Sequence, residues 1–179
     1  MDYTEKAIRR VNAYQGIIVD VTTDMVELSN GAVTMREVVH HPGGVCVAAV
    51  DEDGRIAVVR QFRYPFQTHL LELPAGKLEH DEEPLPAAKR ELSEETGLEA
   101  DTWTPLGALY TSPGFSTEKL YIYLATGLHQ GSAHPDPNEF LDVIRMPLGE
   151  LLERIERDEI CDAKTVAGAL RAERAMRGN

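Results

Sequence analysis

Residues 76–98 constrain the fold more than any other stretch, because they combine helix-terminating residues with a dense cluster of glutamates. Pro84 suits the first turn of a helix, where its missing N–H would have no partner in any case. Gly97 suits the left-handed position that follows a helix. Apolar residues recur between them at helical spacing: Leu85, Ala88 and Leu92. The stretch therefore predicts a helix between Pro84 and Gly97 with one apolar face.

The same helix would carry three carboxylates within one turn, from Glu91, Glu94 and Glu95. Like charges at these spacings destabilise a helix by roughly 0.2–0.5 kcal/mol per pair, and anions are unfavourable near a helix C-terminus. A divalent cation held by oxygen ligands would compensate for the repulsion. A solvated acidic surface is the alternative for an isolated glutamate cluster, and the neighbouring residues decide between the two.

Those neighbours fit the Nudix-box pattern G-x5-E-x7-R-E-U-x-E-E-x-G-U, in which U is a bulky aliphatic residue. Every specified position is filled: Gly76, Glu82, Arg90, Glu91, Leu92, Glu94, Glu95, Gly97 and Leu98. The chain therefore resembles the Nudix hydrolases, which cleave nucleoside diphosphates linked to another moiety. In that family the motif forms a loop–helix–loop that holds Mg²⁺ or Mn²⁺ against a pyrophosphate.

The resemblance implies a metal site with two or more ions. Its main ligands would be Glu91, Glu95 and the backbone carbonyl of Ala75, with Glu94 as a further or shared ligand that also takes part in catalysis.

Four other residues of the motif are interpreted as structural. Glu82 and Arg90 are expected to form an ion pair that holds the loop against the helix. Gly76 and Gly97 would mark the turns before and after it.

Two phrases, one before the box at residues 60–65 and one leading into it at residues 72–77, resemble ADP-ribose pyrophosphatases of the same family. In that subgroup the residue matching Arg63 contacts the substrate. Pro113 lies fifteen residues beyond Leu98, an offset that marks the subgroup.

The same likeness makes the residue matching Glu118 a contact of the adenosine ribose. Arg36, in the N-terminal segment, is a further candidate for binding substrate.

The catalytic base is expected in an acidic loop near residue 139. Glu139 matches the family's glutamate best, and Asp136 and Asp142 are close enough in sequence to leave the assignment open.

The predicted reaction is metal-dependent hydrolysis of ADP-ribose to AMP and ribose 5-phosphate. Another nucleoside diphosphate derivative, such as GDP-mannose, another nucleotide sugar, NADH or a dinucleoside polyphosphate, is the nearer alternative. A non-catalytic nucleotide sensor is the more distant one, because such domains commonly lose the box glutamates that this chain retains.

The composition favours a small molecule as binding partner over a nucleic acid or a membrane. The net charge of −12 argues against a nucleic-acid polymer or an anionic membrane surface. No apolar run approaches the length of a membrane span. Cys46 and Cys161 lack metal-ligand spacing and are expected to be small buried residues, so a cytoplasmic location is predicted.

The resemblance implies an α/β (α+β) fold, the Nudix α/β/α sandwich with a mixed β-sheet and an N-terminal antiparallel β extension. Residues 1–42 would be that extension, a dimerisation segment of a homodimer, and residues 43–179 the hydrolase domain.

Within the extension, residues 14–21 and 24–28 are expected to form strands separated by Thr22 and Thr23, and Asn30-Gly31 is expected to form a turn.

Residues 44–50 predict a strand buried on both faces. Residues 148–157 and 163–177 predict helices, the second capped by Asp162.

Overall fold

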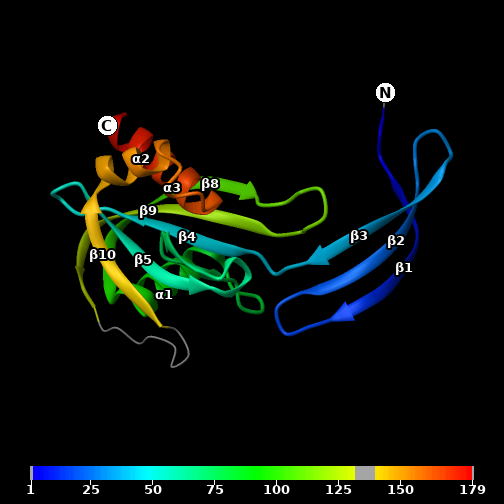
Figure 1. Ribbon diagram of the computed structural model, residues 1–179, viewed down its shortest axis with the longest axis horizontal. Helices are drawn as coiled ribbons and strands as arrows, with labels where there is room; N and C mark the ends of the chain where they lie inside the picture. Colours follow the sequence, from blue (N-terminus) through cyan, green and yellow to red (C-terminus); the bar gives the residue numbers. More distant parts are fainter. Residues whose placement is uncertain (1, 132–139, 179) are drawn as a thin grey trace. The chain divides into compact units, whose positions relative to one another are not determined.

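The computed structural model describes residues 2–131 and 140–178 (Figure 1). These ranges contain ten strands and three α-helices, of which α1 is the helix of the box. In chain order they are β1 (Lys6–Gln15), β2 (Asp20–Glu27), β3 (Val33–His40), β4 (Gly44–Ala49), β5 (Arg55–Arg63), β6 (Thr68–Glu72), β7 (Ala75–Lys77), α1 (Pro84–Thr96), β8 (Leu98–Tyr110), β9 (Lys119–Gln130), β10 (Leu141–Pro147), α2 (Leu148–Glu156) and α3 (Ala163–Arg177).

Contacts divide the chain into two compact units, which are described separately. Unit 1 comprises Met1–Gly43 and Tyr110–Lys119, and unit 2 comprises Gly44–Leu109 and Leu120–Asn179. The domain boundary expected from the sequence, between residues 42 and 43, stays a prediction.

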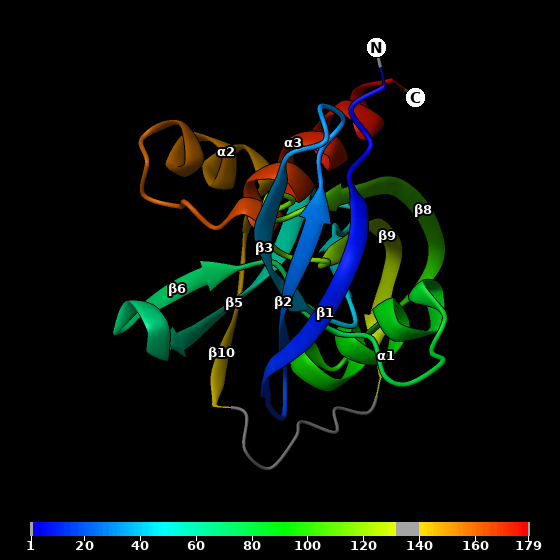
Figure 2. The ribbon, with the colours of Figure 1, turned by 90° about the vertical axis from the view of Figure 1, so that its right-hand side faces the viewer.

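Unit 1 is built on an antiparallel sheet of β1, β2 and β3, which lie side by side in that order (Figure 2). The turn predicted at Asn30-Gly31 joins β2 to β3. Gly31 has a φ of 82° and donates its N–H to the carbonyl of Leu28 at 2.9 Å. Glycine adopts this left-handed conformation without strain, which explains the residue at this position.

The first hairpin of unit 1 turns earlier than the sequence suggested. The Gly16 N–H donates to the Val19 carbonyl at 3.0 Å, so the chain reverses there. Thr22 and Thr23, expected in the turn, lie inside β2, where they pair with Asn12 and Val11 of β1. The apolar run after Gly16 resembles a strand interior, yet Ile17 is fully exposed at the turn.

The segment Tyr110–Lys119 belongs to unit 1 because it bonds to the end of β3. The Val39 N–H donates to the Phe115 carbonyl at 2.7 Å, and the Thr117 N–H donates to the Val39 carbonyl at 3.0 Å. The His41 N–H also donates to Oγ1 of Thr117 at 2.9 Å.

Unit 2 contains two sheets. One has the order β7-β4-β9-β8 and is mixed, because β4 runs antiparallel to β7 and parallel to β9. The other has the antiparallel order β10-β5-β6. The α+β class and mixed sheet predicted from the sequence are therefore confirmed.

Strand β4 lies between two apolar layers, as predicted for residues 44–50. Cys46 and Ala48 join a core with residues of α2 and α3, whereas Val45 and Val47 join a second core with residues of α1. Alternate residues of a strand point to opposite faces, so helices cover β4 on both sides (Figure 1). Unit 2 is thus an α/β/α sandwich.

Helix α1 has the predicted ends. Pro84 occupies the first turn, and Gly97 ends the helix with a φ of 68° while donating to the Ser93 carbonyl. The predicted apolar face needs correction at Leu85, which is 36% exposed, whereas Ala87 is fully buried. The buried face is rotated because it includes two glutamates.

Helices α2 and α3 also lie where the sequence placed them. Asp162 caps α3 by accepting the Thr165 N–H at 3.0 Å and the Thr165 hydroxyl at 2.6 Å. Within the described residues, none of the helices has the length and apolar character needed to cross a bilayer.

The two cysteines differ in environment, contrary to the expectation that both are buried. Cys46 is fully buried, and its burial raises the pKa of the thiol to about 12. Cys161 is exposed and donates to the Asp158 carbonyl at 3.2 Å. Its place just before the start of α3, rather than its residue type, determines its exposure.

Candidate active site

The buried face of α1 carries carboxylates as well as apolar groups. Glu91 is 8% exposed and Glu95 is 6% exposed. The Ala75 N–H donates to Oε2 of Glu95 at 2.9 Å, so strand β7 lies directly against this part of the helix. Burying a carboxylate is costly unless it is hydrogen-bonded or paired with a cation, and the solvated acidic surface considered for the sequence is excluded for these two residues.

Gly76 allows Glu91 to approach the β7 backbone. A Cβ atom at this position would lie 2.0 Å from both Cδ and Oε1 of Glu91 and 2.3 Å from its Oε2. Any other side chain would displace the Glu91 carboxylate. Gly76 was expected at a turn, but it lies within β7, because that strand pairs with β4 and Gly76 is opposite Val45. The first glycine of the motif therefore determines where this carboxylate lies.

Arg90 joins the loop after β7 to the acidic face of α1. Its Nε and Nη2 each donate to a different oxygen of Glu82 at 2.9 Å, which is the pairing expected from the sequence. Its Nη1 donates at 2.8 Å to both Glu91 and Glu94. The hydrogen bonds to Glu82 raise the pKa of Arg90 and lower that of Glu82. Arg90 therefore orients two of the predicted metal ligands.

The donor atoms at this place fit a hard divalent cation. They comprise two buried carboxylates, the half-buried carboxylate of Glu94 and the backbone of Ala75, all of which supply oxygen. Three glutamates, Glu82, Glu91 and Glu94, surround the single positive charge of Arg90, so a cation would reduce an excess of negative charge. In residues 2–131 and 140–178, no group of three or more His, Cys, Asp or Glu side chains is arranged as a complete metal site.

Arg63, predicted to contact substrate, is paired within unit 2. Its Nε and Nη2 donate at 2.7 Å to the two oxygens of Glu72, which is only 1% exposed. Lys164 also donates to Glu72, from the start of α3. The sequence analysis missed Glu72 and Lys164. The sequence did carry a signal for Glu72, because it is a charged residue inside the otherwise apolar run at residues 70–74.

The other predicted substrate residues belong to unit 1. Arg36 donates to both oxygens of Glu5, at 3.0 and 2.6 Å. Pro113 lies in an exposed loop, and Glu118 accepts the Thr111 hydroxyl at 2.5 Å. Their part in substrate binding stays a prediction.

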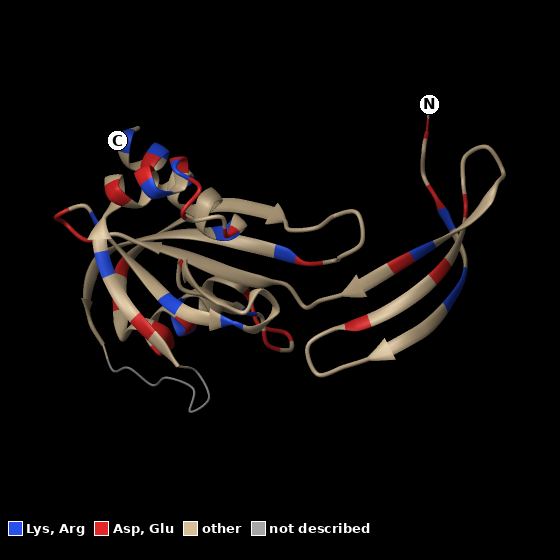
Figure 3. Ribbon diagram, in the orientation of Figure 1, with Lys and Arg blue, Asp and Glu red and all other residues tan. Residues whose placement is uncertain are grey.

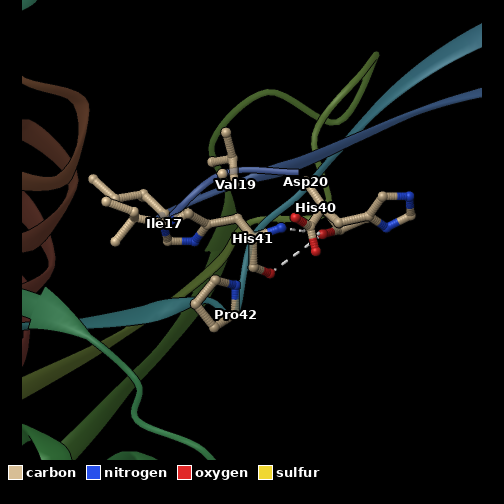
Figure 4. A pocket seen from close by; sticks show the side chains of 9 residues that line it. Ile17, Val19, Asp20, His40, His41 and Pro42 are labelled. Carbon is tan, nitrogen blue, oxygen red and sulfur yellow. Dashed lines mark hydrogen bonds between the residues drawn. The ribbon is translucent and has the colours of Figure 1, made fainter. Parts of the chain in front are cut away.

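Unit 1 also contains an open pocket of about 350 Å³ (Figure 4). It is formed by the first hairpin turn, the end of β3 and the Thr117 segment: Gly16, Ile17, Ile18, Val19, Asp20, His40, His41, Pro42 and Thr117. The hydrogen bond between His41 and Thr117 fixes one wall. The sequence analysis assigned no role to these residues.

Two of the three carboxylates considered for the catalytic base, Glu139 and Asp136, lie outside the described residues. Asp142 lies on β10 with its side chain 3.6 Å from Nη1 of Arg60.

Charges of both signs are distributed over the described surface. On unit 1, basic segments of β1 lie beside acidic segments of β2 (Figure 3), and Arg10 on β1 pairs with Asp24 on β2 at 2.6 Å. Helix α3 carries four basic residues, Lys164, Arg171, Arg174 and Arg177, and one acidic residue, Glu173.

The chain belongs to the Nudix family, since a family model described as NUDIX domain matches residues 40–167. The match contains the whole box and both sheets of unit 2. The chain is therefore a Nudix hydrolase.

Individual proteins and one solved structure are similar to this chain over most of its length. The chain is 43% identical over 163 residues to the ADP-ribose pyrophosphatase of Bacillus subtilis (strain 168), covering 90% of this chain and 88% of the relative. It is 42% identical to the methanol dehydrogenase activator of Bacillus methanolicus, with 92% and 90% covered. A solved structure described as an ADP compounds hydrolase has a TM-score of 0.86 at 23% identity, covering 97% and 95% of the two chains, and shows the shared fold.

Proposed function

We propose that this chain hydrolyses the pyrophosphate bond of ADP-ribose, giving AMP and ribose 5-phosphate. The observation that carries the proposal is the position of Glu91 and Glu95, two buried carboxylates held against the backbone of Ala75 and Gly76. The likeness to an ADP-ribose pyrophosphatase over 90% of the chain supports the choice of substrate. Pro113 and Glu118, which match that subgroup in sequence, agree with this choice.

The box residues would hold the metal. Glu91, Glu95 and the Ala75 carbonyl are the proposed ligands, with Glu94 as a further one. When bound, Mg²⁺ or Mn²⁺ would neutralise charge around phosphorus and lower the pKa of a water molecule. Nudix hydrolases generally depend on a divalent metal, and an all-oxygen donor set agrees with this requirement.

The chain's own residues would orient the reactants. Arg90 holds Glu91 and Glu94 in place through its two hydrogen bonds, so these carboxylates need not reorganise during the reaction. Arg63 would bind a phosphate oxygen, which suits a guanidinium. Arg36, Pro113 and Glu118 would contact the substrate.

Hydrolysis adds a water oxygen to one phosphorus while the bridging P–O bond breaks. A carboxylate must accept the proton of that water. Glu139 is the proposed base, and Asp136 and Asp142 are the alternatives. Glu94, half-buried beside Arg90, would assist in catalysis.

Product analysis tests the proposal. Purified protein with Mg²⁺ is given ADP-ribose, GDP-mannose, NADH and diadenosine polyphosphates, with Glu94→Gln and Glu95→Gln as variants. We expect AMP and ribose 5-phosphate to form fastest from ADP-ribose, and both variants to lose at least about 10²-fold in kcat. Faster turnover of another substrate would refute the choice of ADP-ribose and retain the pyrophosphatase mechanism. Nucleotide binding without turnover of any substrate would show that the protein is a non-catalytic nucleotide sensor.

A second candidate function comes from the relative in Bacillus methanolicus, whose name describes activation of methanol dehydrogenase. Its sequence identity to this chain, 42%, is close to the 43% of the Bacillus subtilis pyrophosphatase, so both activities should be measured. Addition of this protein to a methanol dehydrogenase assay, with Glu95→Gln as the control, would show whether activation occurs and whether it depends on hydrolysis.

We also propose that the protein is a cytoplasmic homodimer. The β1–β3 sheet supports the dimer, because one face exposes apolar side chains that share a side of the strands: Val11, Tyr14, Met25 and Met35. Sedimentation should give twice the monomer mass of 19.8 kDa. The variant Met35→Glu should shift it toward the monomer, and an unchanged dimer would show that this face is not the interface.

A further inference from the structure

Glu72 is the most deeply buried acidic side chain among the described residues that have a measured exposure, at 1%. It lies at the end of β6. A buried carboxylate requires charged partners or several hydrogen bonds. Here Arg63 donates to both oxygens at 2.7 Å, and Lys164 donates to Oε2 as well. The two cations come from β5 and α3, so Glu72 joins three elements of unit 2.

Lys164 is fixed at the start of α3. Its Nζ also donates to Oδ1 of Asp162 at 3.0 Å, and Asp162 caps the helix through Thr165. Oγ1 of Thr165 in turn accepts the N–H of Leu73 at 2.9 Å. The residue that follows Glu72 in the chain is thereby bonded to the helix that supplies Lys164.

A glycine permits this close packing. A Cβ at Gly168 would lie 2.5 Å from Cδ1 of Leu73 and 3.5 Å from Sγ of Cys46. Glycine inside a helix costs about 1 kcal/mol relative to alanine, and here it lets α3 approach the strands. The first turns of α3 are therefore held against the end of β6 by packing as well as by hydrogen bonds.

Arg63 is only partly enclosed by this network. Its side chain is 39% exposed, in contrast to the buried Glu72. Nε and Nη2 are bonded to Glu72, whereas no hydrogen bond from Nη1 to any residue in 2–131 or 140–178 is recorded. Hydrogen bonding to Glu72 raises the pKa of Arg63, and the negative charge of Glu95 adds to this effect. One side of the guanidinium is thus fixed while the other faces solvent, within electrostatic reach of a box carboxylate.

We propose that Glu72 and Lys164 are positioning residues that hold Arg63 with its Nη1 side ready to bind a phosphate oxygen of the substrate. The inference rests on the proposed function. An arginine side chain loses about 2 kcal/mol of rotamer entropy when it becomes fixed, and the network fixes it before substrate arrives. Preorganisation of this kind increases affinity because the ordering cost does not fall on binding.

A double-mutant cycle tests the inference. Glu72→Gln keeps the shape of the side chain and removes its charge, and we expect KM for ADP-ribose to rise about tenfold, equivalent to about 1.4 kcal/mol, with kcat changed by less than about threefold. In the Arg63→Ala background the same change should alter KM by less than about twofold, because Glu72 acts through Arg63.

Lys164 provides a second variant for the case in which Glu72→Gln does not fold. Lys164→Met should raise KM by about threefold, and Lys164→Arg should restore it, since a cation still reaches Glu72. Glu173→Gln removes an ion pair with the exposed Arg177 on the same helix and serves as the matched control, with KM unchanged.

Binding of ADP-ribose in EDTA separates this inference from the proposed function. Calorimetry on the metal-free protein should show binding of ADP-ribose that is about tenfold weaker for Glu72→Gln and about threefold weaker for Lys164→Met, whatever the rate of turnover. A wild-type protein that binds ADP-ribose without hydrolysing it would refute the proposed function alone. Equal affinities in wild type and both variants, or an equal effect of Glu72→Gln with and without Arg63, would refute the positioning role.

Discussion

Substitution of Gly76 by alanine should damage activity far more than stability. The added Cβ would lie 2.0 Å from Cδ and Oε1 of Glu91, whereas real Cβ contacts essentially never fall below 3.0 Å. The Glu91 carboxylate must therefore move by about 1 Å. It lies at the end of a flexible side chain, so the movement is feasible, and it displaces a proposed metal ligand.

The two consequences have different magnitudes. A displacement of about 1 Å in a catalytic group costs on the order of 10²-fold in rate. Overpacking costs about 1–3 kcal/mol, and the mobility of the Glu91 side chain places this substitution at the lower end. We therefore expect kcat for ADP-ribose to fall about 10²-fold while the free energy of unfolding falls by about 1 kcal/mol.

Three measurements on the variant decide the matter. Product formation with saturating Mg²⁺ gives kcat, calorimetric titration with Mn²⁺ gives metal affinity, and urea denaturation gives the free energy of unfolding. Gly149→Ala is the matched control, because a Cβ at Gly149 on α2 has no heavy atom within 4 Å. It should keep full activity and gain about 0.4–1 kcal/mol of stability.

Wild-type kcat and Mn²⁺ affinity in Gly76→Ala would refute the reasoning, because Glu91 would then tolerate displacement. A large loss of stability with normal activity per folded molecule would also contradict it. That result would make Gly76 a packing residue only.

Three other predictions address one ion pair of the motif, one ion pair of unit 1 and the metal. Arg90→Lys loses the two-pronged hydrogen bonding to Glu82, so urea denaturation should show a loss of about 1–3 kcal/mol, and an unchanged value would contradict a structural role. The Arg10 guanidinium lowers the pKa of Asp24 in the folded protein. The ion pair therefore stabilises the protein above the unfolded pKa of about 3.9, and this stabilisation is lost as pH falls through the lower folded pKa. In Asp24→Asn the free energy of unfolding should decline less steeply on acidification than in the wild type, and parallel curves would disprove this. EDTA should abolish hydrolysis and Mg²⁺ should restore it, whereas activity that persists in EDTA would exclude metal dependence.

The sequence predicted best the features that depend on local chemistry. Gly97 ends α1 in the left-handed conformation, and Asp162 caps α3 through Thr165, both as expected from residue type and spacing. The box pattern likewise placed Glu91 and Glu95 on one helix. Fixed spacing within a helix specifies these positions without knowledge of the rest of the fold.

Features that depend on tertiary contacts were predicted less well. The run after Gly16 was interpreted as a strand because it is β-branched, yet its place in a turn follows from the pairing of β1 with β2. Glu72 and Lys164 are 92 residues apart, and only the folded chain brings them together. Leu85 was placed in the core because helical spacing alone does not reveal that buried glutamates rotate the face.

Because only one of the two cysteines is exposed, Cys161 can be labelled selectively without any mutation. Cys46 is fully buried with a raised pKa, so a maleimide dye should react with Cys161 alone in the folded protein. The dye would lie next to Asp162, where α3 begins. Its fluorescence would report the opening of the first turn of α3 in real time, and the reaction of a second thiol would give the rate at which the core becomes accessible.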